Sequence, residues 1–123
     1  MKTNARKNLG DFGESTAAKF LKDKAYEIVA TNYRCRYGEI DIVARDNNQI
    51  VFVEVRTKKG RSFGTPEESV GSIKQSRMVS AAQTYLQDKG FENSDWRIDV
   101  VAIEVNSRDK VQRIDVLKNA VVG

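Results

Sequence analysis

Carboxylate side chains interrupt two apolar, β-branched stretches of the segment GEIDIVARDNNQIVFVEVRTKKG, which runs from Gly38 to Gly60. Glu39 and Asp41 lie in the first stretch, and Glu54 lies in the second. Acidic residues are unfavourable in strands, and like charges on facing positions repel one another. Their presence in both stretches therefore indicates a role for these carboxylates beyond building a sheet.

The polar residues between the two stretches predict a β-hairpin that turns at Asn47-Asn48, because Asn tolerates the positive φ of short hairpin loops. With this turn, Asp41 and Glu54 become direct cross-strand partners on one face of the sheet. Two carboxylates so placed are destabilising unless they share a proton or bind a cation together. The register thus predicts a site for an oxygen-ligated divalent cation.

A second interpretation of the same residues is structural. Glu39 would face Arg56 in this register, and the four charged side chains would form a salt-bridge ladder on an exposed face. Glu14 favours the first interpretation, because it borders the apolar stripe of a predicted helix and can lean toward the sheet. From the pattern alone, both interpretations stay open.

Composition narrows the chemistry. The chain has 123 residues, one cysteine and no histidine. A single cysteine excludes an intramolecular disulfide, and the absence of histidine excludes histidine-based catalysis. Together they argue against a structural zinc site, because the usual cysteine and histidine ligands are lacking. Any metal must be held by oxygen atoms, which selects Mg²⁺, Mn²⁺ or Ca²⁺. A net charge of +4 suits a polyanionic partner. We expect a single domain over residues 1–123, no membrane span and a cytoplasmic location.

Hydrophobic periodicity predicts the elements that position these residues. Helices are expected at Leu9 to about Lys24 and at Ser72 to about Asp88, the second with a capping box of Ser72 and Gln75 and an end at Gly90. Lys58 to Pro66 is expected to be a loop. Strands are expected at Tyr26–Cys35, Glu39–Arg45, Gln49–Thr57, Trp96–Val105 and Val111 to about Leu117. The order α-β-β-β-α-β-β predicts an α/β domain around a mixed five-stranded sheet flanked by helices.

The chain resembles the YraN-like family of small bacterial proteins in the segments GDFGESTAAKFL, GEIDIVA, VFVEVRT and DWRIDVVAIEV. The resemblance covers nearly the whole chain in order. It implies a restriction-endonuclease-like fold, similar to that of Holliday-junction resolvases, and hence a Mg²⁺- or Mn²⁺-dependent endonuclease that acts on structured DNA. The signature of that fold is a helix Glu, a strand Asp and then Glu-x-Lys on the next strand.

Carried onto this sequence, the signature assigns Glu14 as the helix acid, Asp41 as the strand acid and Glu54 as the Glu of Glu-x-Lys. The resemblance implies that Asp41, Glu54 and the backbone carbonyl of Val55 hold the metal, with Glu14 contributing through water. Arg56 stands where the signature has Lys. Because Arg does not deprotonate, it cannot act as a general base, although it can bind a phosphate.

Several basic residues follow Glu54 in the sequence. Either Lys58 or Lys74 could replace the missing amine. Contacts with nucleic acid, DNA in preference to RNA, are expected from five cations, namely Arg56, Lys58, Lys59, Arg61 and Lys74. No predicted element resembles a recognition helix, so binding should depend on shape more than on base sequence.

Two other functions stay open at this stage. The fold could be a catalytically silent module that binds nucleic acid, because of Arg56, or an assembly protein that uses its sheet edge. A resolvase-like enzyme would also be expected to form a homodimer.

Asp99, which interrupts the apolar run RIDVV, is expected to be a buried, hydrogen-bonded acid, with metal ligation as the alternative.

Overall fold

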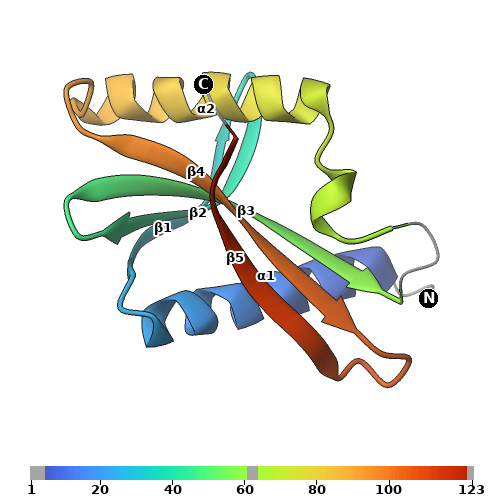
Figure 1. Cartoon of the computed structure of the whole chain (residues 1–123). Coiled ribbons are helices and arrows are strands. Elements are labelled where there is room, and N and C mark those ends of the chain that lie inside the picture. The colour runs from blue at the N-terminus through green and yellow to red at the C-terminus, as the bar shows by residue number, and fades with distance from the viewer. Residues whose placement is uncertain (1–4, 61–63, 122–123) are drawn as a thin grey trace.

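The computed structural model describes residues 5–60 and 64–121. It contains every predicted helix and strand in the predicted order (Figure 1). The elements are α1 (Ala5–Asp23), β1 (Glu27–Cys35), β2 (Gly38–Asp46), β3 (Gln49–Lys59), the 3-10 turn η1 (Glu67–Ser69), α2 (Ser72–Lys89), β4 (Trp96–Val105) and β5 (Val111–Val121). The α/β class and the order α-β-β-β-α-β-β expected from the sequence are confirmed.

The five strands form one sheet in the order β1-β2-β3-β4-β5. Neighbouring strands are antiparallel except for β3 and β4, which are parallel. A parallel pair needs a crossover connection, and η1 with α2 provides it. Figure 1 shows α2 on one face of the sheet and α1 on the other, so each face has a helix to cover it.

Alternation along β3 divides the core into two clusters. Ile50 and Phe52 pack with α2, whereas Val51 and Val53 pack on the α1 side. Because side chains of a strand alternate between faces, Glu54 belongs to the α2 side. Phe52 is fully buried and meets Tyr85 of α2 edge-to-face, with ring centroids 5.6 Å apart. This packing fixes α2 against the part of β3 that carries Glu54.

Both helices end in the same hydrogen-bonded motif. Tyr26 N–H donates to the Leu21 carbonyl and Ala25 N–H donates to the Lys22 carbonyl, while Phe91 and Gly90 repeat the pattern after α2. The residue at the turn has φ of 73° at Gly90 and 70° at Ala25. Only the second position carries a Cβ atom in the left-handed region, where Gly is the favoured residue.

We expect Ala25→Gly to stabilise the protein by about 0.5–1 kcal/mol, because it removes the left-handed penalty of a non-Gly residue. Gly90→Ala should destabilise by a similar amount and serves as the reciprocal control. Urea unfolding of both variants measures the two changes. Equal destabilisation by both substitutions would contradict this explanation.

Two local expectations need correction. β3 continues to Lys59, so Lys58 and Lys59 are strand residues and not part of the predicted loop. The reason is that β4 extends to Val105 and supplies ladder partners for both lysines. The N-cap of α2 is Gly71 without a side-chain cap, so the predicted capping box does not form; Gln75 instead donates to the Val70 carbonyl.

Within the described ranges, neither helix combines the length and the apolar character that a membrane crossing requires.

Candidate active site

The β2–β3 hairpin has the predicted register. It turns at residues 47 and 48, with φ of 56° at Asn47, and its ladder runs from the pair Asp46 and Gln49 to the pair Ile42 and Val53. Asp41 and Glu54 occupy the next position. There the Asp41 carboxylate accepts a hydrogen bond of 2.8 Å from the Val55 N–H. At this position the Val55 N–H of β3 is therefore bonded to a side-chain oxygen of β2 and not to a backbone carbonyl.

Asp41 and Glu54 are both buried, with exposed fractions of 9% and 4%. Burial and the charge of Asp41 raise the pKa of Glu54 to about 7. Burial also raises the pKa of Asp41, although the hydrogen bond from Val55 opposes the increase. The exposed salt-bridge ladder considered from the sequence is therefore wrong, because this face lies beneath α2 and not in solvent.

Two cations contact Glu54. The Arg56 Nε atom lies 3.2 Å from Glu54 Oε2, and the Lys74 Nζ atom lies 3.5 Å from the same oxygen. Lys74 lies in the first turn of α2, so the crossover helix brings an amine to the carboxylate pair. Both cations favour the ionised form of Glu54, but burial and Asp41 outweigh them in the net pKa.

Glu14 approaches from the opposite side of the sheet. Burial, followed by the charge of Asp41, raises the pKa of Glu14 to about 7. Its position depends on Gly13, because a Cβ atom there would overlap with Thr57 Oγ1 of β3. Gly13 thus lets α1 approach β3 closely. Glu14 also lines a cavity of about 300 Å³ between α1 and β1.

Glu39 does not form the pair with Arg56 that the salt-bridge interpretation predicts. Its carboxylate accepts a hydrogen bond of 2.8 Å from Arg34 Nε of β1, so it does not pair with Arg56. The cause is the separation of β2 from β3 beyond Ile42, which leaves Glu39 paired with Arg34 in the β1–β2 ladder. Arg56 binds Glu54 of its own strand instead.

Within residues 5–60 and 64–121, no group of three or more acidic or cysteine side chains is close enough together to hold a metal ion. Among the described residues, Asp41 and Glu54 therefore form a pair without a third carboxylate beside them, and the charge of Asp41 raises the pKa of Glu14. The pair itself suits a hard cation, because it offers two buried carboxylates whose repulsion a dication would relieve.

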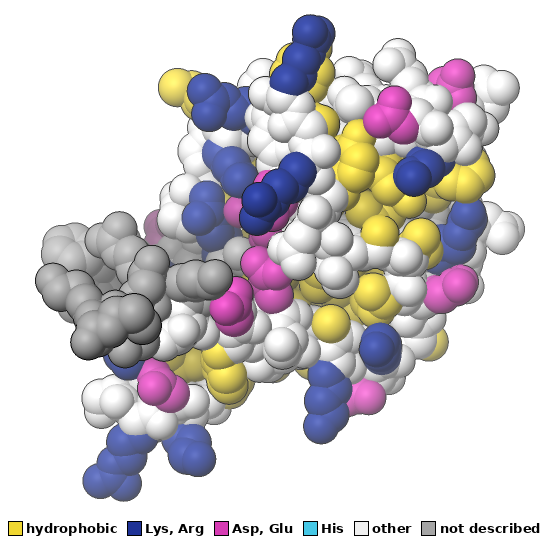
Figure 2. Space-filling model, turned by 180° about the vertical axis from the view of Figure 1, so that it is seen from behind, with side chains coloured by type: hydrophobic (Ala, Val, Ile, Leu, Met, Phe, Trp, Pro, Cys, Tyr) yellow, Lys and Arg dark blue, Asp and Glu magenta, His cyan; other side chains and the backbone are white. Residues whose placement is uncertain are grey.

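The other predicted cations are dispersed. Lys58 Nζ lies 3.3 Å from the Gly64 carbonyl oxygen, and Lys59 forms an ion pair of 2.8 Å with Asp109 in the β4–β5 turn. Arg61 lies outside the described residues. Figure 2 shows basic and acidic side chains next to one another across one face, beside a separate hydrophobic patch. This face is a mixed surface and not a uniformly basic one.

Arg113 is a positioning residue that the sequence did not reveal. It donates a hydrogen bond of 2.6 Å to Glu67 of η1, and its Nη1 lies 2.9 Å from Glu104 Oε2 of β4. These contacts hold η1 against β5 just before α2 begins, and hence help to place Lys74. No local pattern signals this role, because the three residues lie in three separate elements.

Asp99 is the buried, hydrogen-bonded acid that its place in an apolar run predicts. It has no exposed surface, and it accepts hydrogen bonds from Tyr26 OH, Arg97 and the Asn119 N–H. It lies on the α1 side of the sheet. Asp99 is therefore separate from the Asp41–Glu54 pair.

The fold and this pair define a small α/β protein whose mixed sheet carries a buried dicarboxylate at the point where two strands separate. The family model described as "Uncharacterised protein family UPF0102" matches residues 13–103. The chain belongs to this family, which is the YraN-like family indicated by its motifs.

Relatives resemble the chain over nearly its whole length. A UPF0102 protein of Moorella thermoacetica is 43% identical over 118 residues, covering 96% of this chain and 98% of the relative. A UPF0102 protein of Roseiflexus castenholzii is 45% identical over 120 residues and covers 97% of both chains. The region matched by the family model, residues 13–103, includes Asp41 and Glu54.

Proposed function

We propose that this protein is a divalent-metal-dependent endonuclease that hydrolyses phosphodiester bonds in structured DNA. The observation that carries the proposal is the buried pair of Asp41 and Glu54, whose repulsion needs a counter-charge, with Arg56 and Lys74 beside it. Buried carboxylates with raised pKa values are typical of functional sites.

Asp41 and Glu54 would hold Mg²⁺ or Mn²⁺, with the Val55 carbonyl as a further oxygen donor and Glu14 acting through water. When bound, such an ion supplies Lewis-acid activation of water and of the scissile phosphate. Arg56, one-third exposed at 33%, binds a phosphate oxygen and stabilises negative charge as it develops.

The remaining groups handle the proton and the attacking water. Glu14, with a pKa of about 7, is suited to accept the proton that the water loses at neutral pH. Lys74 stands in for the amine that the motif lacks, because its Nζ is 3.5 Å from Glu54. The water oxygen then forms a bond to phosphorus as the bond to the leaving strand oxygen breaks.

The test is incubation of the full chain with a four-way DNA junction, a flap and a plain duplex, with Mg²⁺, with Mn²⁺ and with EDTA. We expect metal-dependent cleavage of a branched substrate and its loss in Asp41→Asn. Asp23→Asn is a matched control, because Asp23 is an exposed acid at the end of α1. Absence of cleavage with every substrate and metal, or full activity in Asp41→Asn, would contradict the proposal.

A second candidate function, a silent nucleic-acid-binding module, is favoured by one observation. Arg56 replaces the amine of the motif, and both Arg56 and Lys74 already contact Glu54. Such a module would bind DNA with a steep dependence on salt and would not cleave it.

Arg56→Lys separates the two functions. If the wild-type site is silent, restoring the amine should produce cleavage about 10²-fold above the wild-type background, the lower end of the range for acid–base groups. A wild-type enzyme that already uses Arg56 to bind phosphate should instead lose activity. Arg34→Lys, a change at an exposed Arg of β1, controls for effects of the substitution itself.

A further inference from the structure

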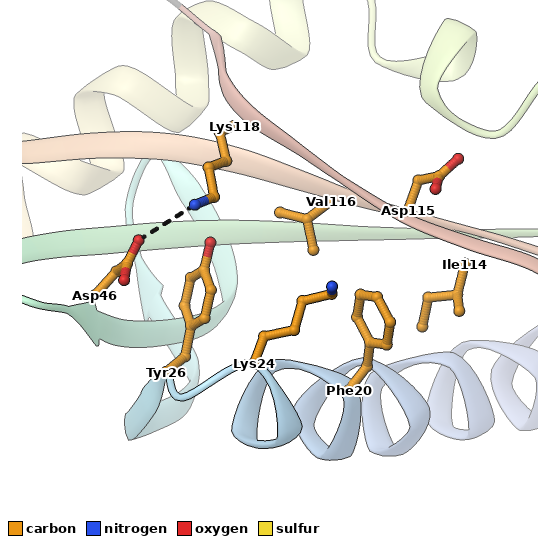
Figure 3. A pocket seen from close by; sticks show the side chains of 8 residues that line it. All are labelled: Phe20, Lys24, Tyr26, Asp46, Ile114, Asp115, Val116 and Lys118. Carbon is orange, nitrogen blue, oxygen red and sulfur yellow. Dashed lines mark ion pairs between the residues drawn. The ribbon is translucent and has the colours of Figure 1, made fainter.

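A cleft of about 700 Å³ opens between the end of α1 and strand β5 (Figure 3). It lies on the α1 side of the sheet, whereas Glu54 lies on the α2 side. Its volume falls within the range of small-molecule sites. The residues that line it are Phe20, Lys24, Tyr26, Asp46, Ile114, Asp115, Val116 and Lys118.

One wall of the cleft is polar and held in place. Tyr26 OH donates to buried Asp99 at 3.2 Å and accepts from Arg97 Nη2 at 3.0 Å. Arg97 Nη2 also donates to Asp46 Oδ2 at 2.8 Å. Burial raises the pKa of Tyr26 to about 12, while the hydrogen bond from Arg97 lowers the pKa of Asp46. At neutral pH this wall therefore presents a neutral phenol and a charged carboxylate.

The cleft contains cationic groups that a ligand can use. Among the described residues, no carboxylate forms an ion pair with Lys24, whose Nζ lies 5.0 Å from the centroid of the Phe20 ring. Lys118 Nζ is 3.6 Å from Asp46 Oδ2, but its side chain is 61% exposed. The Asp46 oxygen is shared with Arg97, and Asp115, the other carboxylate of the lining, pairs with Arg113, so neither carboxylate neutralises Lys24. An anionic group is thus favoured between the two lysines.

The other two walls are apolar. In Figure 3, Phe20 of α1 and Lys24, just after the end of α1, point toward Ile114 and Val116 of β5, while Asp115 points away. A flat ring fits between an aromatic face and branched aliphatic side chains. Asp46, at the end of the same cleft, can accept hydrogen bonds from the hydroxyl or amino groups of a ligand.

From this arrangement we infer that the cleft binds a nucleoside 5′-monophosphate group. The base lies between Phe20 and the pair of Ile114 and Val116, the phosphate lies on the ammonium groups of Lys24 and Lys118, and Asp46 accepts from the sugar or base. The ligand is either a free mononucleotide or the 5′-phosphorylated end of a nucleic-acid strand. The inference does not depend on nuclease activity.

Calorimetric titration of the full chain with adenosine 5′-monophosphate, adenosine and inorganic phosphate tests the inference. We expect the monophosphate to bind more tightly than either fragment. Lys24→Ala and Lys118→Ala should each weaken binding by about tenfold, the size of a lost charge-assisted hydrogen bond. Lys22→Ala, at an exposed lysine near the end of α1, should leave binding unchanged.

A comparison of 5′-phosphorylated and 5′-hydroxyl oligonucleotides identifies the source of the group. Tighter binding of the phosphorylated strand than of the free monophosphate supports a strand end, and the reverse supports a free mononucleotide. No saturable binding of the monophosphate or of the phosphorylated strand at millimolar concentration would overturn the inference. Unchanged affinity in the folded Lys24→Ala and Lys118→Ala variants would overturn it as well.

Discussion

Glu54→Gln should lower the rate of DNA cleavage while making the metal-free protein more stable. The two effects have one cause, namely a buried carboxylate next to Asp41. The amide keeps the shape of the side chain but removes a metal-binding charge. We expect cleavage to fall by about 10²–10³-fold, as when one group that stabilises transition-state charge is lost.

The gain in stability follows from the raised pKa of Glu54, which goes from 4.5 to about 7 through burial and the charge of Asp41. Each pKa unit corresponds to about 1.4 kcal/mol, so at pH 8 the ionised Glu54 destabilises the folded state by roughly 2 kcal/mol once the coupling with Asp41 is discounted. This pKa already includes the attraction of Lys74 and Arg56. The neutral amide should recover most of that free energy.

Urea unfolding at pH 8 in EDTA, together with a cleavage assay in Mn²⁺, measures both effects. Glu27→Gln is the control, because Glu27 is an exposed acid of β1 and should change neither quantity. A variant in which stability and activity fall together would show that Glu54 is a structural residue.

The second large effect is an inverted dependence of stability on pH. Between pH 4.5 and 7 the folded protein binds more protons than the unfolded chain, because the pKa values of Glu54 and Glu14 are raised to about 7. Stability of the metal-free protein should therefore decrease as pH rises through this window. Asp46 and Glu67 have lowered pKa values, so the stability that their ionised forms provide is lost only below about pH 4.5.

Binding of Mn²⁺ should show the opposite trend, because the ion displaces protons from the Asp41–Glu54 pair. A group with a pKa of about 7 is mostly protonated at pH 6 and mostly ionised at pH 8, so affinity should rise by about tenfold between them. Thermal unfolding with and without Mn²⁺ at both pH values measures the change. Glu54→Gln should flatten the trend; an equal Mn²⁺ effect at the two pH values in the wild type would contradict the assignment.

The fold was predictable because its signals are local. Alternation of apolar residues identified the strands, and Gly90 marked the end of α2 through its left-handed φ. The length of β3 was not predictable, because Lys58 and Lys59 have no strand signal of their own and are paired only through β4. The end of a strand depends on its neighbour as much as on its own residues.

The candidate site was predictable only where it depends on local signals. The turn at Asn47 and the alternation of the hairpin sufficed to place Asp41 beside Glu54. Glu39 was paired with the wrong residue because the predicted β2–β3 register continued beyond Ile42, where the two strands separate. No residue type in the hairpin indicates where this separation occurs. Glu14 was expected to join the pair, but its distance from Glu54 depends on how closely α1 packs on β3.

By itself, the sequence determined which carboxylates share a face of the sheet, because side-chain direction along a strand and the geometry of a short turn are local properties. Only the tertiary structure decided which groups from other elements reach that face. Lys74 arrives with the crossover helix, and Arg113 holds the turn before it. The cleft between α1 and β5 likewise exists only because both elements cover the same side of the sheet. Such contacts depend on the packing of whole elements, which no short stretch of residues specifies.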